Sequence, residues 1–400
     1  MARKTSSVVG FPRSSSAAPP AGKPQAFFLR ITNLGDISAA YGEGGLVRVL
    51  WAAWSRVASL SWARMAQGGM EADGVVFRLA TLDADPGPAW REEVLRAVCA
   101  EPVEVGSAVV MPAAEILDAH YAQTATPAAR ARKSPGAGWV EDMASAAALH
   151  AAVVQERLEF RFQAVRSADG ATILYEPWVV FVVGADGERT DLETFRPGIE
   201  GLGLTRYLDW RLVRHAIAFL RCVPDLQLGC PISAASARLD EWWIGILAEL
   251  VAEPDVARRL VLEMRPIARD MVADAKVFIE EVQGLGVRCA LQGVGVELTL
   301  DQARRAGARI VKLQAPGAEG PAETLRAVVD AAQTVTPDVI IPGGGDRAVA
   351  ARARAAGAPW IEGPADPRRD AKAAARAAGT SLEGLYARWM AVRPDQSQAG

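Results

Sequence analysis

The chain has 400 residues, half of them hydrophobic, which is enough for two or three domains with sizeable cores. Its formal net charge of -3 provides no bulk attraction for nucleic acid or an anionic membrane, so we expect neither as a partner. No stretch approaches the roughly 20 apolar residues that span a bilayer, and the basic start is not followed by the apolar core of a signal peptide. The four cysteines are scattered without a CxxC pair, which is typical of free thiols in a reducing compartment. Composition therefore predicts a cytoplasmic protein without a membrane span.

The first predicted unit is a small α/β domain that follows a tail. Residues 1–25 combine four basic residues with many Ser, Pro and Ala, which predicts a disordered tail. The apolar pattern then predicts, in order, strand 26–31, a helix over about 36–60, strand 74–80, helix 92–100 and strand 103–111. Strands interleaved with helices predict an α/β sandwich over 26–121. Residues 122–140, rich in Ala, Pro, Gly and Arg, predict a linker, in which a helical portion stays open.

The second predicted unit is a barrel over residues 141–370. A helix at 141–157 is expected first, and eight apolar strands follow it at 160–165, 173–181, 226–233, 259–265, 287–295, 309–315, 338–344 and 358–364. Helical segments separate the strands from the second one onward, so the pattern predicts a TIM-type (β/α)8 barrel. Residues 371–400 are expected to form a C-terminal helix and tail. Chemistry in such barrels lies where the strands end, so the polar residues there are the candidates.

The strand ends of this barrel resemble, in order, the motifs of the EAL family, whose domains are cyclic di-GMP phosphodiesterases. Gln163 in RFQAV matches the glutamine of a YQP-type strand, and Glu176 in YEPWVV matches the signature glutamate. Glu263 in LEMRP matches the first glutamate of LExTE, and Lys312 in VKLQ matches the lysine of IKID. The best local match is FRPGIEGLGLTRYLDWRLVRHA, which is similar to FIPxAEExGLxxxLDxWVLxxA. The resemblance covers roughly residues 149–364 and implies an EAL-like barrel.

The segment before the linker is similar to a GGDEF domain. LRITNLGDISAAYGEGG aligns with LDIDxFKxINDxYGHxxGD, and the framework is kept at Leu29, Ile31, Leu34, Ile37, Tyr41 and Gly42. The signature loop falls at residues 68–72 or 72–74, and the sequence leaves this register open. Arg30 and Thr32 stand where the family's first strand carries the aspartates that hold Mg²⁺ against a triphosphate, so the resemblance implies no GTP cyclisation. Together the two resemblances identify a degenerate tandem GGDEF–EAL protein.

Substitutions in the barrel predict the loss of catalysis. Hydrolysis by an EAL domain implies two divalent cations held by carboxylate and amide oxygens. The residues expected for these cations and for the substrate are replaced at five positions: Val180 for an arginine, Pro231 for an asparagine, Gln292 and Gly293 for two aspartates, and Pro342 for a glutamate. The two carboxylates that remain cannot hold two metal ions. We therefore expect no catalytic residue, no metal and no other cofactor, and Mg²⁺ would be required only if residual activity existed.

The retained residues leave two interpretations. Glu176, Glu263 and Lys312 could belong to a remnant phosphate or guanine site. Alternatively, Lys312 could serve as the counter-ion of carboxylates that would be costly to bury unpaired. The second interpretation is favoured, and it predicts an ion pair from Lys312 to Glu263 or Glu176.

These observations favour a non-catalytic regulatory or scaffolding protein in cyclic di-GMP-related signalling, with a protein partner. The tryptophan-bearing helices are candidate surfaces, because Trp242 and Trp243 point about 100° apart on a helix and should not both be deeply buried. A cyclic di-GMP effector without hydrolysis and a residual phosphodiesterase are the alternatives. The loss of the arginine and both aspartates weakens the effector hypothesis. The family resemblance also implies a homodimer.

Overall fold

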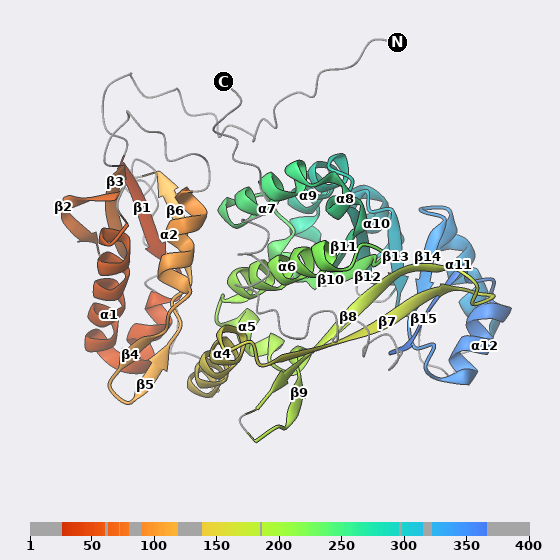
Figure 1. Ribbon diagram of the computed structural model, residues 1–400, viewed down its shortest axis with the longest axis horizontal. Coiled ribbons are helices and arrows are strands. Elements are labelled where there is room, and N and C mark those ends of the chain that lie inside the picture. Colours follow the sequence, from red (N-terminus) through yellow and green to blue (C-terminus); the bar gives the residue numbers. More distant parts are fainter. Residues whose placement is uncertain are drawn as a thin grey trace, which may run out of the picture.

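The computed structural model describes residues 26–60, 63–71, 73–79, 90–118, 138–184, 186–295, 298–314 and 322–365. The described chain forms a small α/β domain beside a larger barrel (Figure 1). The expected tail at 1–25, nearly all of the linker and the C-terminal helix at 371–400 lie outside the described residues. Within the described part, none of the helices combines the length and hydropathy that a bilayer-spanning segment needs.

The N-terminal domain is a four-stranded antiparallel sheet with two helices, in the strand order β2-β3-β1-β6. Its elements are β1 (Ala26–Ile31), α1 (Leu34–Ala58), β2 (Ala63–Glu71), β3 (Gly74–Leu79), α2 (Trp90–Cys99), β4 (Val103–Val105), β5 (Ala108–Val110) and β6 (Ala114–Asp118). The rings of Phe27, Phe77 and Trp90 meet in the core. Gly42 kinks α1 because its φ of 73° lies in the left-handed region, where glycine is favoured.

Two sequence expectations for this domain were wrong. The single strand expected at 103–111 is a hairpin of β4 and β5, because Gly106 adopts a φ of 63° and the chain reverses there. Strands β2 and β6 were not predicted. β6 pairs with β1 across 83 to 91 residues of sequence, from Ile31 with Ala114 to Phe27 with Asp118, and no local pattern predicts such a pairing.

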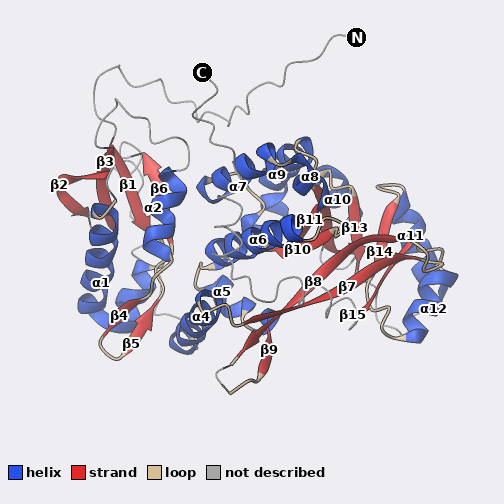
Figure 2. Cartoon of the chain, viewed as in Figure 1, coloured by secondary structure: helices blue, strands red, loops and turns tan. Residues whose placement is uncertain are grey.

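The barrel closes with eight strands, as the sequence predicts. Strands β10 to β15 are parallel neighbours, β8 pairs in parallel with β10, and β7 runs antiparallel to both β15 and β8. The strands are β7 (Leu158–Ser167), β8 (Ile173–Val183), β10 (Leu228–Ile232), β11 (Leu260–Met264), β12 (Arg288–Val294), β13 (Ile310–Leu313), β14 (Asp338–Ile341) and β15 (Trp360–Ala365). β7 is antiparallel because a short turn, and no helix, joins it to β8 (Figure 2).

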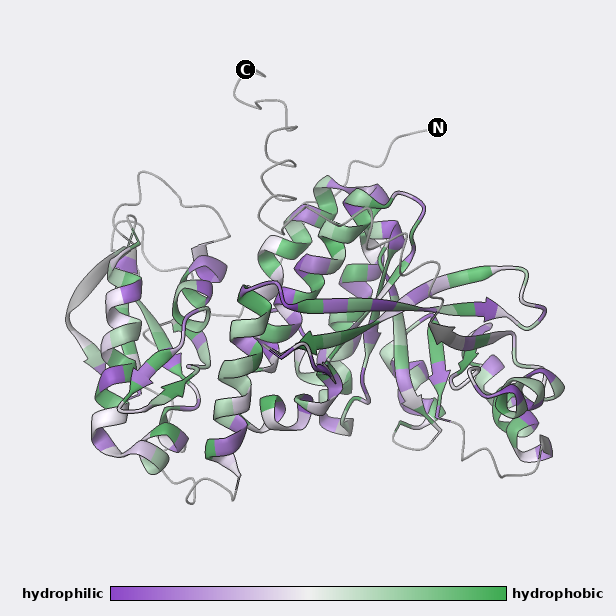
Figure 3. Ribbon diagram, turned by 60° about the horizontal axis from the view of Figure 1, so that its bottom comes forward, coloured by the Kyte–Doolittle hydropathy of each residue, from purple (hydrophilic) through white to green (hydrophobic). Residues whose placement is uncertain are grey.

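Helices surround these strands, and a short extra strand extends the sheet. The helices are α4 (Trp139–Val154), α5 (Arg196–Gly201), α6 (Thr205–Cys222), α7 (Glu241–Ala252), α8 (Pro254–Arg259), α9 (Val272–Gly284), α10 (Leu300–Ala306), α11 (Ala322–Gln333) and α12 (Arg347–Ala355). Strand β9 (Arg189–Asp191) pairs with β8 and leads into the 3₁₀ turn η2 (Leu192–Thr194). Hydrophobic and hydrophilic residues share each helix (Figure 3), as expected where one side packs on the barrel.

The barrel interior is built in layers by strand alternation. A buried cluster of Val165, Tyr175, Val261, Ala290, Ile310 and Ile340 fills one layer. Residues two positions further along the barrel axis form the next layer, because side chains of one strand alternate between its faces. This second layer takes one residue from each strand: Gln163, Pro177, Pro231, Glu263, Gln292, Lys312, Pro342 and Glu362. We call it the mouth layer.

Trp242 and Trp243 are both buried, contrary to expectation. Trp242 packs against Tyr207 and Trp210 of α6, while Trp243 packs against Phe278 of α9 and donates its Nε1–H to a backbone carbonyl. Because α7 has neighbours on two sides, side chains about 100° apart can both be covered. The tryptophan pair is therefore not an exposed docking surface.

Candidate functional site

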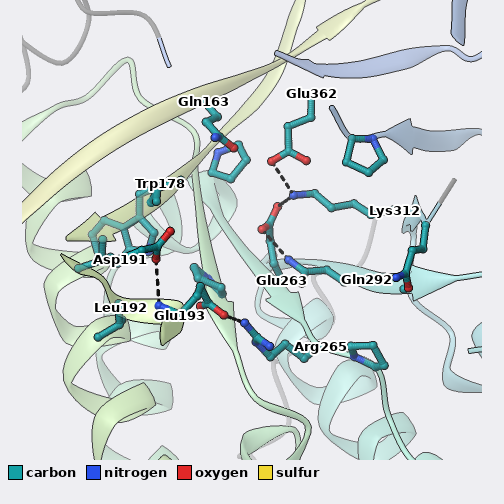
Figure 4. A pocket seen from close by; sticks show the side chains of 18 of the residues that line it. Gln163, Trp178, Asp191, Leu192, Glu193, Glu263, Arg265, Gln292, Lys312 and Glu362 are labelled. Atoms are coloured by element: carbon teal, nitrogen blue, oxygen red, sulfur yellow. Dashed lines mark hydrogen bonds and ion pairs between the residues drawn. The ribbon is translucent and has the colours of Figure 1, made fainter. Parts of the chain in front are cut away.

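A cavity of about 420 Å³ opens at the mouth layer. All eight mouth-layer residues line it, and the walls add charged side chains from β9, η2 and the end of β11, namely Asp191, Glu193 and Arg265 (Figure 4). Val180 and Gly293 also line it. The cavity thus lies where the sequence placed the candidate site.

Lys312 lies at the centre of the charged groups in this cavity. Its Nζ is 2.6 Å from Glu263 Oε1 and 3.1 Å from Glu362 Oε1 (Figure 4). Tyr175 donates its hydroxyl to Glu263 Oε1 at 2.6 Å, and Gln292 donates its Nε2–H to Glu263 Oε2 at 3.1 Å. The ion pair expected between Lys312 and Glu263 is therefore present. Glu362 is an additional partner that sequence reasoning missed, although the WIEGP strand end contained it.

The Tyr175 ring reaches Glu263 because a neighbouring residue has no side chain. A Cβ on Gly229 would lie 2.8 Å from the Tyr175 ring. Any larger residue at this position of β10 would displace the ring and its hydroxyl. The hydrogen bond to Glu263 therefore depends on a glycine in the adjacent strand.

The electrostatics of the cluster follow from burial and from two carboxylates sharing one ammonium. Burial alone would lower the pKa of Lys312, but Glu263 and Glu362 outweigh it and raise that pKa above its ordinary value. Burial also raises the pKa of Glu362; Lys312 opposes this shift and Glu263 adds to it. Tyr175 has a strongly raised pKa, because it is buried beside both carboxylates. At neutral pH the ammonium and the phenol are both protonated, so each can donate to the carboxylates.

Glu176 does not belong to this cluster. It is buried and is not among the residues that line the cavity. Its neighbours Tyr175 and Pro177 face the barrel interior, so alternation along β8 directs Glu176 to the opposite face. The structure brings Gln163, Glu263 and Lys312 together and leaves Glu176 out, so of the two partners expected for Lys312 it is Glu263 that forms the ion pair, and the grouping of Glu176 with these residues was wrong.

The mouth layer does not fit a pair of divalent cations. Pro231 and Pro342 offer no side-chain oxygen, Gly293 has no side chain, and the Gln292 amide donates to Glu263. Oxygen ligands of Mg²⁺ are normally carboxylates, and the ammonium of Lys312 already binds the two present. Across the described residues, no group of three or more His, Cys, Asp or Glu side chains could hold a metal ion.

Sequence reasoning missed the charged wall of the cavity. Asp191 caps η2 by accepting the backbone N–H of Glu193, and Glu193 pairs with Arg265. Burial raises the pKa of Asp191, which Arg265 partly opposes. Asp191 and Glu193 come from a three-residue strand and a single 3₁₀ turn, which are too short to produce a periodic signal.

In the N-terminal domain, the cation Arg30 stands at a position where the resemblance to a GGDEF domain predicts an acid. Arg30 of β1 pairs with Glu115 at 3.1 Å and lies 3.7 Å from Asp73. Thr32 donates its hydroxyl to a backbone carbonyl. The β2–β3 hairpin turns between Glu71 and Gly74, so Asp73 lies in the turn, whereas Gly68 and Gly69 lie within β2.

Comparisons with known proteins agree on the barrel. Residues 146–365, more than half of the chain, match the family model described as EAL domain. The S helix-GGDEF-EAL segment of LapD from Vibrio cholerae is similar in its apo form, with a TM-score of 0.50 and 14% identity over 85% of this chain and 88% of that one. The same protein bound to c-di-GMP has a TM-score of 0.50 and 14% identity, covering 86% and 90%. The EAL domain of FimX from Pseudomonas aeruginosa bound to c-di-GMP has a TM-score of 0.48 and 20% identity, covering 55% and 93%. No curated protein matched the sequence.

Proposed function

The chain belongs to the EAL domain family, and from this premise we propose that it is a non-catalytic member that acts as a regulatory or scaffolding protein in cyclic di-GMP-related signalling. In this proposal the N-terminal α/β domain is a degenerate GGDEF-like domain, and the chain acts by binding a protein partner. The fold likeness to LapD over most of the chain supports the two-domain assignment.

The observation that carries the proposal is the position of the Lys312 ammonium. It lies between the two carboxylates of the mouth layer, where family chemistry needs divalent cations. An ammonium can neutralise carboxylates, but it cannot lower the pKa of a bound water as a metal does. The positions that could bring further ligands hold proline, glycine and glutamine. Without two cations and an activated water, hydrolysis of a phosphodiester has neither a nucleophile nor a stabiliser of the leaving oxygen.

The charge of the cavity disfavours the effector alternative. Its lining holds four carboxylates, of Asp191, Glu193, Glu263 and Glu362, against the two cations of Arg265 and Lys312. Both cations already pair with these carboxylates. Cyclic di-GMP carries two phosphodiester charges, and an acidic cavity without free cations repels them. A protein surface is therefore the better candidate ligand.

Two measurements on the full-length protein test the proposal. Nucleotide turnover with Mg²⁺ or Mn²⁺ should not exceed that of the Glu263→Gln variant, in which the central carboxylate is removed at constant shape. Calorimetry should detect no cyclic di-GMP binding at micromolar concentration. Turnover that the Glu263→Gln change abolishes would establish a phosphodiesterase, whereas micromolar binding without turnover would establish an effector; either result overturns the scaffold proposal.

A further inference from the structure

Helix α6 makes two groups of polar contacts with different parts of the molecule. One group of contacts connects it to the N-terminal domain, and the other connects it to the wall of the cavity. The residues that anchor the two groups, Asp209 and Trp210, are adjacent in the chain. A rigid helix transmits a displacement along its length, so the two groups cannot move independently.

The contacts with the N-terminal domain converge on Glu92 of α2, a buried carboxylate. It accepts from Arg214 Nη2 at 2.6 Å and from Trp210 Nε1 at 3.2 Å, both on α6. Its second oxygen accepts the backbone N–H of Gly245 on α7 at 2.8 Å. A Cβ on Gly245 would lie 2.0 Å from this oxygen, so the two helices approach closely because this residue is glycine.

The contacts with the cavity begin at Asp209, whose side chain is 1% exposed. Its Oδ1 accepts from Arg196 Nη1 at 3.0 Å, and its Oδ2 accepts from the Ser233 backbone N–H at 2.8 Å. Arg196, equally buried, also donates its Nε–H to Glu193 at 3.0 Å. Glu193 pairs with Arg265 at the cavity wall.

Arg196 cannot exchange these partners for water. A buried guanidinium that loses one carboxylate stays unpaired in a low-dielectric environment, so Arg196 must follow Asp209 when α6 moves. Glu193 has a side chain that is 39% exposed, and it is linked to Arg196 by the hydrogen bond that it accepts from the Nε–H and by its position three residues earlier in the chain. The aligned EAL pattern carries isoleucine where this chain carries Arg196, so this part of the network is a departure from that pattern.

We propose that α6 couples the docking of the N-terminal domain to the geometry of the cavity wall, through the series Glu92, Arg214 and Trp210, Asp209, Arg196, Glu193 and Arg265. Undocking of α2 releases α6, shifts Asp209, and opens the wall that β9 and η2 form. The coupling holds whether or not the barrel binds a nucleotide, so its test is independent of the proposed function.

Hydrogen exchange of the full-length protein, read by mass spectrometry, tests the coupling. The Glu92→Ala variant should exchange faster at Gly245, which loses its acceptor directly. It should also exchange at least about fivefold faster over residues 189–195 and at Ser233, which Glu92 does not touch. Arg96→Ala, an exposed residue of the same helix, should leave both regions unchanged. Faster exchange confined to Gly245 and α2 overturns the proposal.

Two further variants cover the case in which Glu92→Ala does not fold. Glu92→Gln keeps one acceptor oxygen, for either Trp210 or Gly245, and removes the charge that pairs with Arg214, so it should produce the same pattern with a smaller amplitude. Coupling is reciprocal, so Asp209→Asn should accelerate exchange at Gly245. No change at Gly245 in Asp209→Asn contradicts the coupling.

Discussion

At the residue scale, the decisive group is the Lys312 ammonium. A lysine with a 7% exposed side chain is costly unless it is paired, and here it has two carboxylate partners within hydrogen-bonding distance. Lys312 in turn opposes the rise that burial and Glu263 cause in the pKa of Glu362. Burial of the ammonium therefore requires the two carboxylates, and burial of the carboxylates requires the ammonium.

Replacing Lys312 by methionine should leave Glu263 and Glu362 without their cation. Breaking a buried ion pair by removing one partner costs about 3–5 kcal/mol, so we expect a loss of that order in the free energy of unfolding from urea titration. Mn²⁺ should then raise the melting temperature of the variant and leave that of the wild type unchanged. Lys276→Met is the matched control, since the Lys276 side chain is about half exposed and pairs with the exposed Glu280 on its own helix. A variant as stable as the control would exclude Lys312 as the structural counter-ion.

The pH dependence of stability should report on Glu362. Its pKa is raised in the folded chain, so its contribution to stability is complete below its unfolded pKa and is lost as pH rises through the folded value. The Glu362→Gln variant has no such loss. The stability of the wild type relative to the variant should therefore fall as pH rises above about 4, the ordinary pKa of a glutamate. A relative stability that rises over this range would show that Lys312 outweighs burial.

At the element scale, short elements and close helix packing shape the site. Strand β9 and turn η2 bring Asp191 and Glu193 to the cavity, although neither element exceeds three residues. Helix α7 approaches α2 at Gly245, and the same helix buries two adjacent tryptophans. At the cavity wall and at the α2–α7 contact alike, the interacting residues are distant in sequence.

Two glycine-to-alanine substitutions in helices compare the effect of helix propensity alone with the effect of a steric overlap. Gly245→Ala should weaken the α2–α7 contact, because the new methyl group would overlap a Glu92 oxygen. Gly284→Ala, also in a helix, meets no atom within 4 Å and should be neutral or stabilise by up to ~1 kcal/mol. Thermal unfolding of both variants checks this. Equal melting temperatures would mean that α2 moves away at no cost.

At the scale of the whole molecule, the two domains share an interface with buried polar contacts. Glu92 is the buried polar group of this interface, which also includes the partly exposed ion pair of Arg91 with Glu241 and the ring contact of Tyr41 with Trp139. Such an interface holds domains in one orientation more firmly than a surface of exposed ion pairs does.

The full-length protein should consequently unfold in one cooperative transition. Differential scanning calorimetry should give a calorimetric enthalpy equal to the van't Hoff enthalpy for the wild type. Glu92→Ala should lower the transition temperature and separate the domains into two transitions, whereas Arg96→Ala should behave as the wild type. Two transitions in the wild type would show that the interface contributes little.

The sequence by itself determined the order of the barrel strands and placed three of the mouth-layer residues that carry polar side chains at strand ends. Periodicity predicts burial within one element, and strand-end motifs in the family's order place Gln163, Glu263 and Lys312 near one another. It also indicated that the metal ligands are replaced, because residue identity alone excludes proline and glycine as side-chain ligands.

Only the tertiary structure decided which face of β8 carries Glu176, which carboxylates Lys312 binds, and how the domains dock. A single strand does not specify which of its two faces points into the barrel, so Glu176 and Tyr175 could not be distinguished. Glu362 meets Lys312 from 50 residues away, and Glu92 meets Arg214 from 122 residues away. Contacts of this kind depend on how distant segments pack, and local patterns in the chain carry no record of them.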